Sequence, residues 1–427
     1  MGNRQPENTR NFAIAAHGGA GKTALVEAML FNNGVTTRMG RIEDGNTVSD
    51  FAPEEQKRQI SINTSVIAME RNGKQFFILD TPGFADFVGE MRSAVRVADA
   101  LLVAVSGVSG IEVQTDKAWE TGSEFDLPTA FYISRLDREN ADFARVLADI
   151  RADYSDKAAA IFLPIGAEAS FRGVVDLLKN RAYVYQTDGS GKFTEEDVPA
   201  DMADEAAAAR EALVEVIVEA DDDLMMRYLD GETISEEELL PALRKAVRIR
   251  ALLPVLPGSA TVNVGVHQIM DFIADFFPSP LESRSRAAMK GEEAVEVAPD
   301  PAGQFSAICF KVMVDPYVGK LSFLRVNSGT LSSDSAIYNV NKDEDERISS
   351  FKFMTGKEGK DVKEITVGDI VAIPKLHSVQ VGDTLSVKGA TAVFPPIDFP
   401  KPVYSVAVIA KSRADEDKLG NAINRTL

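Results

Sequence analysis

The sequence of 427 residues contains little cysteine, histidine or tryptophan. Its single cysteine, Cys309, excludes an internal disulfide framework and a cysteine-based metal site. The three histidines are scattered along the chain and predict no zinc site. Cys309 lies in the apolar run FSAICFKVMV, which predicts a buried thiol. The N-terminal stretch MGNRQPENTR has no apolar signal core, and with the low cysteine content this favours a cytoplasmic location.

Long apolar runs and an excess of basic residues are also missing. We expect no membrane-spanning segment, because no apolar run reaches about 18 residues. The chain has 46 Lys and Arg against 65 Asp and Glu, a formal net charge of −19. Taken alone, this balance argues against a nucleic-acid partner, since phosphate neutralisation requires clustered basic side chains. The acidic residues concentrate in residues 195–245, however, so other faces are closer to neutral.

Hydrophobic residues make up 45% of the chain, enough to build several packed cores. Strand-like and helix-like segments alternate over residues 10–170, which predicts an α/β fold with a doubly wound sheet. Each expected strand is an apolar run, and these runs are residues 12–16, 75–80, 100–105, 129–134 and 160–166. Since such sheets bind ligands at the carboxyl ends of their strands, residues that follow these strands are candidate site residues.

The segment after the first expected strand has the pattern of a phosphate-binding loop. Residues 16–23, AHGGAGKT, lie between that strand and a run with helical apolar spacing. Loop glycines allow backbone N–H groups to surround phosphate oxygens, and the following helix directs its positive end at them. A chance glycine-rich turn with a surface lysine is the alternative, which the flanking strand and helix disfavour. The expected nucleotide contacts are His17, Gly18, Gly19, Ala20, Gly21, Lys22 and Thr23.

Roles within this pattern differ from residue to residue. Lys22 is expected to reach the outer phosphates, and Thr23 to ligate Mg²⁺. Asp80, in the motif DTPG, follows an apolar strand and is expected to hold Mg²⁺ through water. The Gly83 N–H is expected to meet the γ-phosphate, which would make the following segment a nucleotide-dependent switch.

A second group of residues predicts a guanine pocket. Asp137, in SRLD, follows an apolar strand and can accept two hydrogen bonds from guanine in a pattern that adenine does not offer. Ser134 can support a turn, and Arg135 can lie flat on the base. Ser259 and Ala260 are expected to complete the pocket through a backbone N–H. An ordinary helix cap is the alternative interpretation for Asp137.

The first part of the chain, residues 1–282, is expected to be the nucleotide domain. Within it, residues 168–252 interrupt the strand–helix alternation and predict an insertion. The insertion contains acidic segments with helical spacing at residues 202–228 and 234–247. The simplest interpretation of these segments is a solvated helical face.

The second part of the chain has a different composition. Residues 283–302 are charged and contain prolines, which is typical of a linker. Short apolar runs separated by Gly and Asp turns predict a β-barrel over residues 303–388. Residues 389–427 are expected to contain a second linker and the start of a third, incomplete domain. That part is expected to begin with a strand at 403–410 and to continue as a helix.

These motifs, in this order, resemble those of the translational GTPases, and among them elongation factor G. The resemblance covers nearly the whole chain, including segments 310–329 and 381–385 for a second domain and 411–423 for a third. The motifs that carry it in the first domain are AHGGAGKT (16–23), KRQISI (57–62), DTPGFADFVGE (80–90), SRLD (134–137), LPIGAEASFRGVVDL (163–177) and FPSP (277–280). It implies GTP or GDP and Mg²⁺ as ligands, and a second magnesium hydroxyl from Ser61.

Several positions depart from the family pattern. Phe84 stands where the family has the histidine that positions the attacking water, and phenylalanine cannot hydrogen-bond to water. Gly19 replaces the aspartate usual in the phosphate loop. In the guanine motif, Ser134 replaces asparagine and Arg135 replaces lysine, whereas Asp137 is kept. The chain therefore resembles a divergent paralogue of elongation factor G, and we expect slow GTP hydrolysis.

The resemblance implies a ribosome-associated factor that couples GTP hydrolysis to translocation or ribosome disassembly. Lys22 and Gly83 would then act in catalysis, with Phe84 at the usual histidine position. The implied partners are ribosomal RNA and the stalk protein of the large subunit, and we expect a monomer. A GTP-dependent regulatory module with negligible hydrolysis is the main alternative. Ribosomal-protection and release-factor relatives are a further alternative, disfavoured by the long insertion, and an ATP-using enzyme is disfavoured by Asp137.

Overall fold

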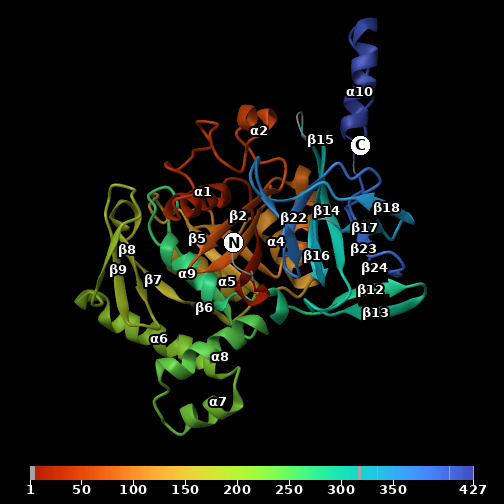
Figure 1. Ribbon diagram of the computed structural model, residues 1–427. Helices are drawn as coiled ribbons and strands as arrows, with labels where there is room; N and C mark the ends of the chain where they lie inside the picture. The colour runs from red at the N-terminus through yellow and green to blue at the C-terminus, as the bar shows by residue number, and fades with distance from the viewer. Residues whose placement is uncertain (1–4, 316–318, 334, 403, 427) are drawn as a thin grey trace.

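A mainly parallel sheet forms the centre of the N-terminal part of the chain (Figure 1). The computed structural model describes residues 5–315, 319–333, 335–402 and 404–426. The strand order in this part is β2-β3-β1-β4-β5-β11-β6, with only β2 antiparallel to its neighbour β3. Its strands are β1 (Thr9–Ala16), β2 (Ser65–Arg71), β3 (Lys74–Asp80), β4 (Ala100–Ser106), β5 (Thr129–Ser134), β6 (Ala158–Ala160) and β11 (Leu253–Pro257).

The central strands of this sheet are buried on both faces. Every residue of β1 and β4 is buried, as expected for parallel strands that helices cover on either side. On the sheet, α1 packs against α9, and α3 packs against α4. The helices of this part of the chain are α1 (Lys22–Asn32), α2 (Pro53–Arg58), α3 (Val88–Val97), α4 (Val113–Glu124), α5 (Phe143–Asp153) and α9 (Val266–Phe276). The predicted α/β fold is confirmed.

The predicted strand at 160–166 is wrong as a single element. The chain turns at Ile161, so that β6 joins the main sheet while β7 joins a separate antiparallel sheet of order β10-β9-β8-β7. This second sheet was not expected from the sequence, and it begins the part of the chain that contains the insertion. Its strands are β7 (Phe162–Ile165), β8 (Gly173–Asp176), β9 (Arg181–Tyr185) and β10 (Phe193–Glu196).

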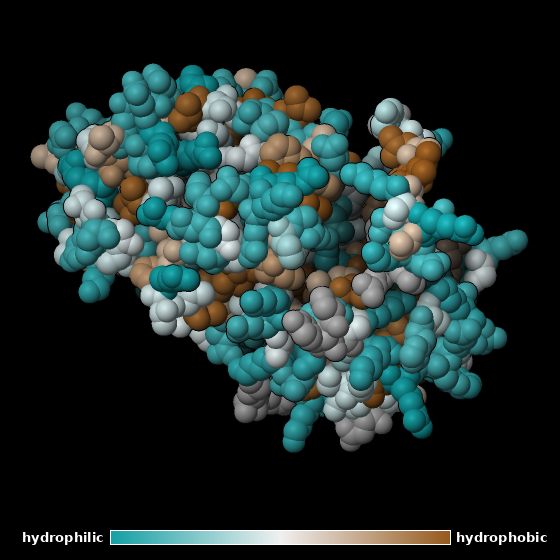
Figure 2. Space-filling model, turned by 90° about the horizontal axis from the view of Figure 1, so that it is seen from above, coloured by the Kyte–Doolittle hydropathy of each residue, from teal (hydrophilic) through white to brown (hydrophobic). Residues whose placement is uncertain are grey.

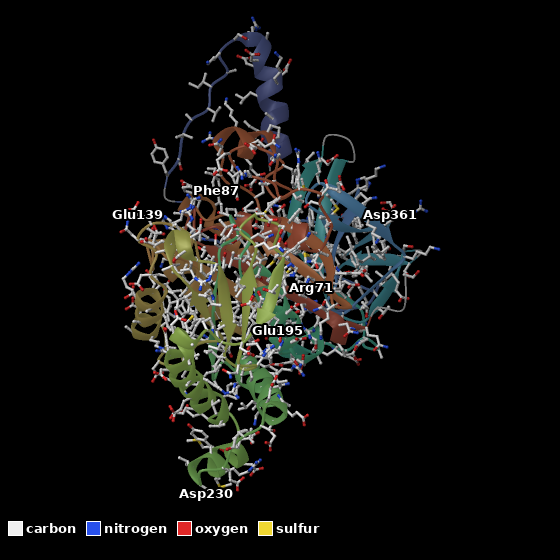
Figure 3. The ribbon with its side chains drawn as sticks, turned by 90° about the vertical axis from the view of Figure 1, so that its left-hand side faces the viewer. Arg71, Phe87, Glu139, Glu195, Asp230 and Asp361 are labelled. Atoms are coloured by element: carbon white, nitrogen blue, oxygen red, sulfur yellow. The ribbon has the colours of Figure 1, made fainter. Side chains whose placement is uncertain are left out.

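The rest of the insertion is helical and contains α6 (Ala203–Val218), α7 (Asp222–Leu229) and α8 (Glu236–Arg248). The predicted helical segment at 202–228 is divided, because the Asp221 side chain accepts from the Leu224 N–H and starts a new helix. Figure 3 places Asp230, just after α7, at the tip of the molecule, and Glu195 of β10 on the sheet above it. The insertion therefore projects from the nucleotide domain with its acidic helices outermost.

A hairpin occupies the segment that we expected to be a linker at 283–302. Its strands β12 (Arg286–Lys290) and β13 (Glu293–Val297) are joined by a turn in which Gly291 has φ of +63°. β12 also pairs with β24 (Ala392–Val393), so the hairpin forms a small sheet with a later part of the chain. The domain bounds themselves stay a prediction.

The second domain is rich in β-structure, as predicted. Its strands continue the same hydrogen-bonded sheet in the order β18-β17-β23-β14-β15-β22-β19, and β20 pairs with β19. Cys309 of β14 is fully buried. Residues 316–318, within the segment 310–329 that resembles the family, lie outside the described residues. The strands are β14 (Ser306–Asp315), β15 (Gly319–Ser328), β16 (Thr330–Ser332), β17 (Ala336–Asn339), β18 (Glu344–Arg347), β19 (Phe351–Thr355), β20 (Glu358–Val362), β21 (Glu364–Thr366), β22 (Ile370–Pro374) and β23 (Thr384–Ser386).

The barrel meets the nucleotide domain along the edge of the central sheet. Thr355 of β19 pairs with Ile67 of β2, and the Gly356 N–H donates to the Val66 carbonyl at 3.0 Å. The Thr355 hydroxyl donates to the Ala68 carbonyl at 2.8 Å. The barrel therefore contacts the strand that directly follows the segment containing Ser61.

A buried ion pair joins the two domains at a second place. Both carboxylate oxygens of Asp99 accept from Nη2 of Arg325, at 2.9 and 2.8 Å. The Asp99 side chain is 0% exposed and the Arg325 side chain 3%. Asn11 donates to the same carboxylate at 2.8 Å, and Arg286 lies 3.5 Å from it. This contact fixes the barrel against the start of β4.

The predicted strand at 403–410 is wrong for its described residues. Residues 404–410 are extended without hydrogen-bonded pairing, because no described strand lies beside them, and Tyr404 and Ile409 are 81% and 85% exposed. The predicted helix is present as α10 (Glu416–Thr426), which projects from the molecule in Figure 1.

Among the described residues, the helices are all too short or too polar to cross a bilayer. The face seen in Figure 2 is mainly hydrophilic, with hydrophobic residues in separate spots.

Candidate functional site

The loop between β1 and α1 has the backbone shape that its glycines predict. Gly19 and Gly21 have φ values of +79° and +96°, in the left-handed region that glycine adopts most easily. Gly21 is the N-cap of α1, so the N-terminus of this helix opens onto the loop. His17 lies at the edge of the loop, with Nε2 3.6 Å from Oε1 of Glu112.

Lys22 and Gly83 lie in direct contact across the loop. The buried Lys22 ammonium donates to the carbonyls of Ala16 and His17, at 3.3 and 3.1 Å. Burial lowers the pKa of Lys22 to about 8, although the nearby carboxylates of Asp80 and Asp50 oppose the shift. A Cβ on Gly83 would collide with Lys22 Nζ and would lie 2.8 Å from the Gly18 nitrogen. Only glycine fits at this close approach to the phosphate loop.

Two hydroxyls and a carboxylate converge where the predicted magnesium site should lie. Thr23 Oγ1 is 3.3 Å from Ser61 Oγ and donates to Asp80 Oδ2 at 3.0 Å. Burial raises the pKa of Asp80 to about 6, and its Oδ1 is buried without a partner. No cluster of His, Cys, Asp and Glu ligands for a metal occurs within the described chain. The hydroxyl pair and the free Asp80 oxygen suit a hard cation that keeps several waters.

Asp50 is a neighbour of this group that the sequence reasoning missed. It is 4% exposed, and its Oδ2 is buried without a partner. Burial raises its pKa to about 7, and the nearby Asp80 charge adds to the effect. Asp50 lies in an irregular stretch without periodicity, so nothing in the local sequence distinguished it from a surface acid.

The expected base-side residues lie close together. The Ser134 hydroxyl donates to the Ala20 carbonyl at 2.7 Å and so ties the end of β5 to the phosphate loop. The Asp137 carboxylate accepts from the Ser259 hydroxyl at 2.5 Å. Arg135 has φ of +59°, and its Nη2 is 3.8 Å from where a Cβ on Gly19 would lie. Strand ends distant in sequence therefore meet at one edge of the sheet.

Phe84 packs on the phosphate loop. A Cβ on Gly18 would lie only 2.9 Å from Cζ of Phe84, so the ring covers the Gly18 backbone directly. The side chain is 40% exposed. An apolar ring therefore lies against this side of the phosphate loop.

A cavity of about 530 Å³ connects the phosphate loop with the base-side residues. Its lining includes most of the predicted residues, whereas His17, Ala20, Asp80 and Asp137 lie beside it. The predicted residues on its wall are Gly18, Gly19, Gly21, Lys22, Thr23, Ser61, Gly83, Phe84, Ser134, Arg135, Ser259 and Ala260. The wall residues that sequence reasoning missed are Ala24, Met39, Gly40, Arg41, Ile42, Glu43, Asp44, Thr47, Gln59, Ile60, Tyr132, Arg138 and Thr261.

Comparison with known proteins agrees with these observations. Residues 7–279 match the family model for the elongation factor Tu GTP binding domain, and residues 304–388 match the model for elongation factor G domain 2. The fold is similar to a crystal structure of a protein from Thermus thermophilus, with a TM-score of 0.86 and 32% sequence identity. The match covers 97% of this chain and 60% of that protein, so the chain spans less than two thirds of its length.

Proposed function

We propose that this chain, which belongs to the translational GTPase family and resembles elongation factor G, is a GTP-dependent switch that acts on the ribosome. The observation that carries the proposal is one cavity that connects the phosphate loop, the Thr23–Ser61 hydroxyl pair and the base-side residues. Guanine-nucleotide binding is implied by the family. The individual residue roles, Mg²⁺ and the ribosome are our proposals.

In this proposal, Lys22 and the loop N–H groups bind the phosphates, and Asp137 with the Ala260 N–H recognises guanine. Thr23 and Ser61 would ligate Mg²⁺ directly, and Asp80 would do so through water. The ion supplies positive charge that offsets the negative charge on the reacting phosphates. Because Ser61 and Gly83 lie on separate segments, contact with the γ-phosphate draws both toward the loop, and hydrolysis releases them.

Phe84 sets the expected rate of hydrolysis. A phenyl ring neither accepts a proton nor orients a water molecule, so the attacking water lacks the side chain that the family resemblance would provide. Positioning and electrostatics dominate phosphoryl transfer, and the remaining groups therefore support slow turnover. If the chain acts as a GTPase, we expect the ribosome to stimulate this slow turnover.

The insertion and the barrel supply the surfaces for the proposed partners. Acidic residues in α6, α7 and α8 are exposed, and α7 lies at the tip of the insertion (Figure 3). By resemblance, this part would dock the flexible stalk protein of the large subunit, and the barrel would approach ribosomal RNA. The proposed outcome is translocation or ribosome disassembly by the whole protein.

The proposal is tested first by calorimetric titration with GTP, GDP and ATP in the presence of Mg²⁺. We expect binding of both guanine nucleotides and much weaker binding of ATP. Absence of guanine-nucleotide binding overturns the proposal, and tighter binding of ATP would favour an ATP-using enzyme.

The role of Phe84 is tested by Phe84→His. We expect faster GTP hydrolysis, by about tenfold or more, because the imidazole can position water. Phe193→His is the matched control, since Phe193 is 37% exposed and lies in β10, outside the cavity wall. A fast wild-type rate without ribosomes that Phe84→His leaves unchanged contradicts the reasoning.

A second candidate function is a regulatory module that binds GTP with negligible turnover. Gly19 and Phe84 favour it, since both replace side chains that the family uses near the γ-phosphate. Single-turnover assays with added ribosomes separate the candidates. Stimulated hydrolysis supports the enzyme, and binding without hydrolysis supports the module.

A further inference from the structure

The wall of the cavity over residues 39–47 has almost no regular structure. Met39 through Asp44 and Thr47 line the cavity, and they lie between the end of α1 at Asn32 and the start of α2 at Pro53. An irregular segment keeps one shape only where other groups satisfy its backbone N–H and C=O. Part of this support is internal, since the N–H groups of Asp44 and Asn46 donate to the Arg41 carbonyl, and side chains from outside the segment supply the rest described below.

Glu27 supplies two of these contacts. It lies one helical turn after Thr23 on α1 and is 1% exposed. Its Oε1 accepts from the Val48 N–H at 2.6 Å, and its Oε2 accepts from the Gly40 N–H at 3.1 Å. One buried carboxylate therefore holds the segment 40–48 at both of its ends, from the same helix that carries Thr23.

The fit around Gly40 makes this contact specific. A Cβ on Gly40 would collide with Oε2 of Glu27 and would lie 2.8 Å from the Asn46 carbonyl and 2.9 Å from Thr47 Cα. No side chain larger than hydrogen fits between the carboxylate and the loop. The loop backbone therefore rests directly on Glu27.

The Glu27 carboxylate is buried, and burial disfavours its charged form. Burial raises the pKa of Glu27, the nearby Asp50 charge adds to the shift, and the backbone N–H groups oppose it. A buried carboxylate costs stability unless it is hydrogen-bonded. Both of its oxygens are used on the segment, and Glu27 does not itself line the cavity.

Residues 62–64, which follow Ser61, are held by other carboxylates. Glu55 accepts from the N–H groups of Ile62 and Asn63, at 3.0 and 2.9 Å. Glu90 of α3 accepts from the Thr64 N–H at 2.7 Å. Glu55 and Glu90 therefore hold the chain next to Ser61, whereas Glu27 holds the segment 40–48.

We propose that Glu27 is a positioning residue that fastens the segment 40–48 over the nucleotide and so sets how fast bound GDP leaves. The proposal rests on the proposed function, since it concerns the same cavity. Glu27 acts through the loop and does not touch the ligand. Loss of either hydrogen bond frees one end of the wall and opens the cavity to solvent.

The test compares Glu27→Gln with the wild-type chain. A glutamine has the same size, but its NH₂ group cannot accept a hydrogen bond from Val48 or Gly40. We expect N-methylanthraniloyl-GDP, in Mg²⁺ buffer, to dissociate at least tenfold faster when excess GDP is added. The ratio of GDP to ADP affinity is expected to stay constant, because the base-side residues are unchanged.

Limited trypsin digestion without nucleotide gives a second measurement. Arg38 and Arg41 are exposed and flank Gly40, so a loosened wall is expected to be cut faster after these residues in Glu27→Gln. Glu54→Gln is the matched control, because Glu54 is exposed on α2. Fragment masses identify the cut sites.

The outcomes separate the two proposals. Dissociation and cleavage within twofold of wild type, in a folded Glu27→Gln chain, overturn the role of Glu27. If Glu27→Gln does not fold, Gly40→Ala perturbs the same contact from the loop side, and the same increases are expected. If the wild-type chain binds no labelled GDP, the proposed function fails, and the digestion without nucleotide decides whether Glu27 holds the segment.

Discussion

The Asp99–Arg325 pair offers a direct test of how the two domains are held together. In Asp99→Asn, the side chain keeps its shape but loses its charge, and the guanidinium of Arg325 stays buried without a carboxylate. Removal of one partner from a buried pair destabilises a protein by about 3–5 kcal/mol. The Asp99 and Arg325 side chains are 0% and 3% exposed, so solvent screens this interaction very little. We therefore expect Asp99→Asn to lower the free energy of unfolding by about 3–5 kcal/mol.

The matched control is Asp361→Asn in the barrel. Asp361 pairs with Lys352 at 2.7 Å, but its side chain is 71% exposed, and Figure 3 places it at the outer edge of the molecule. Exposed pairs contribute about 0–1 kcal/mol. The same Asp→Asn change is therefore expected to have little effect at this position.

The assay is equilibrium unfolding in urea, followed by far-UV circular dichroism and by the fluorescence of Trp119. Trp119 lies in α4 and is the only tryptophan, so it reports on the nucleotide domain. If both probes give the same transition, unfolding is two-state and a single free energy of unfolding describes it. Equal shifts for Asp99→Asn and Asp361→Asn would refute the argument that burial of this pair fixes the interface.

Two further predictions concern a thiol and a turn. Burial and the nearby Asp383 charge raise the pKa of Cys309 to about 12, so we expect a thiol reagent at pH 8 to label it only as the chain unfolds; rapid labelling of the folded chain contradicts this. Gly356 has φ of +60°, and a Cβ at this residue would collide with the Val48 carbonyl. Gly291 has a similar φ of +63°, but no atom of the described residues lies near its Cβ position. We therefore expect Gly356→Ala to lower the free energy of unfolding by more than Gly291→Ala. Urea titration of both variants measures the difference, and equal values would mean that the contact with Val48 contributes nothing.

The phosphate loop and the main sheet could be predicted because their signals are local. Gly19, Gly21 and Lys22 lie within one short loop, and the apolar runs at 75–80 and 129–134 read as buried strands whatever surrounds them. The convergence of Ser134 with Ala20 followed from the rule that parallel strands present their carboxyl ends at one edge.

The part of the cavity wall over residues 39–47 could not be predicted, since its shape depends on contacts with residues distant in sequence. Nothing in the residues near Gly40 indicates that Glu27 accepts from its N–H. A similar limit applies to β2, which pairs antiparallel with β3 and has no apolar run long enough to distinguish it. The run at 160–166 was continuous in hydrophobicity, and only the hydrogen bonds at Ile161 reveal that it divides between two sheets.

Residues 404–410 illustrate a different limit. Their apolar, β-branched composition is typical of a strand, but strand formation also requires a neighbour that offers a matching ladder of hydrogen bonds. Within the described residues no such neighbour is present, and the segment remains unpaired. Composition thus indicates what a segment can form, while the partner decides whether it does.

The junction of β19 with β2 has a consequence for any attempt to isolate the first domain. β2 ends the central sheet, and Thr355 and Gly356 cover the carbonyls of Ala68 and Val66 on its outer side. A fragment that stops before the barrel would expose these groups as a bare sheet edge, which readily recruits strands from other molecules. The barrel thus covers this sheet edge, and we expect its removal to make the first domain aggregate.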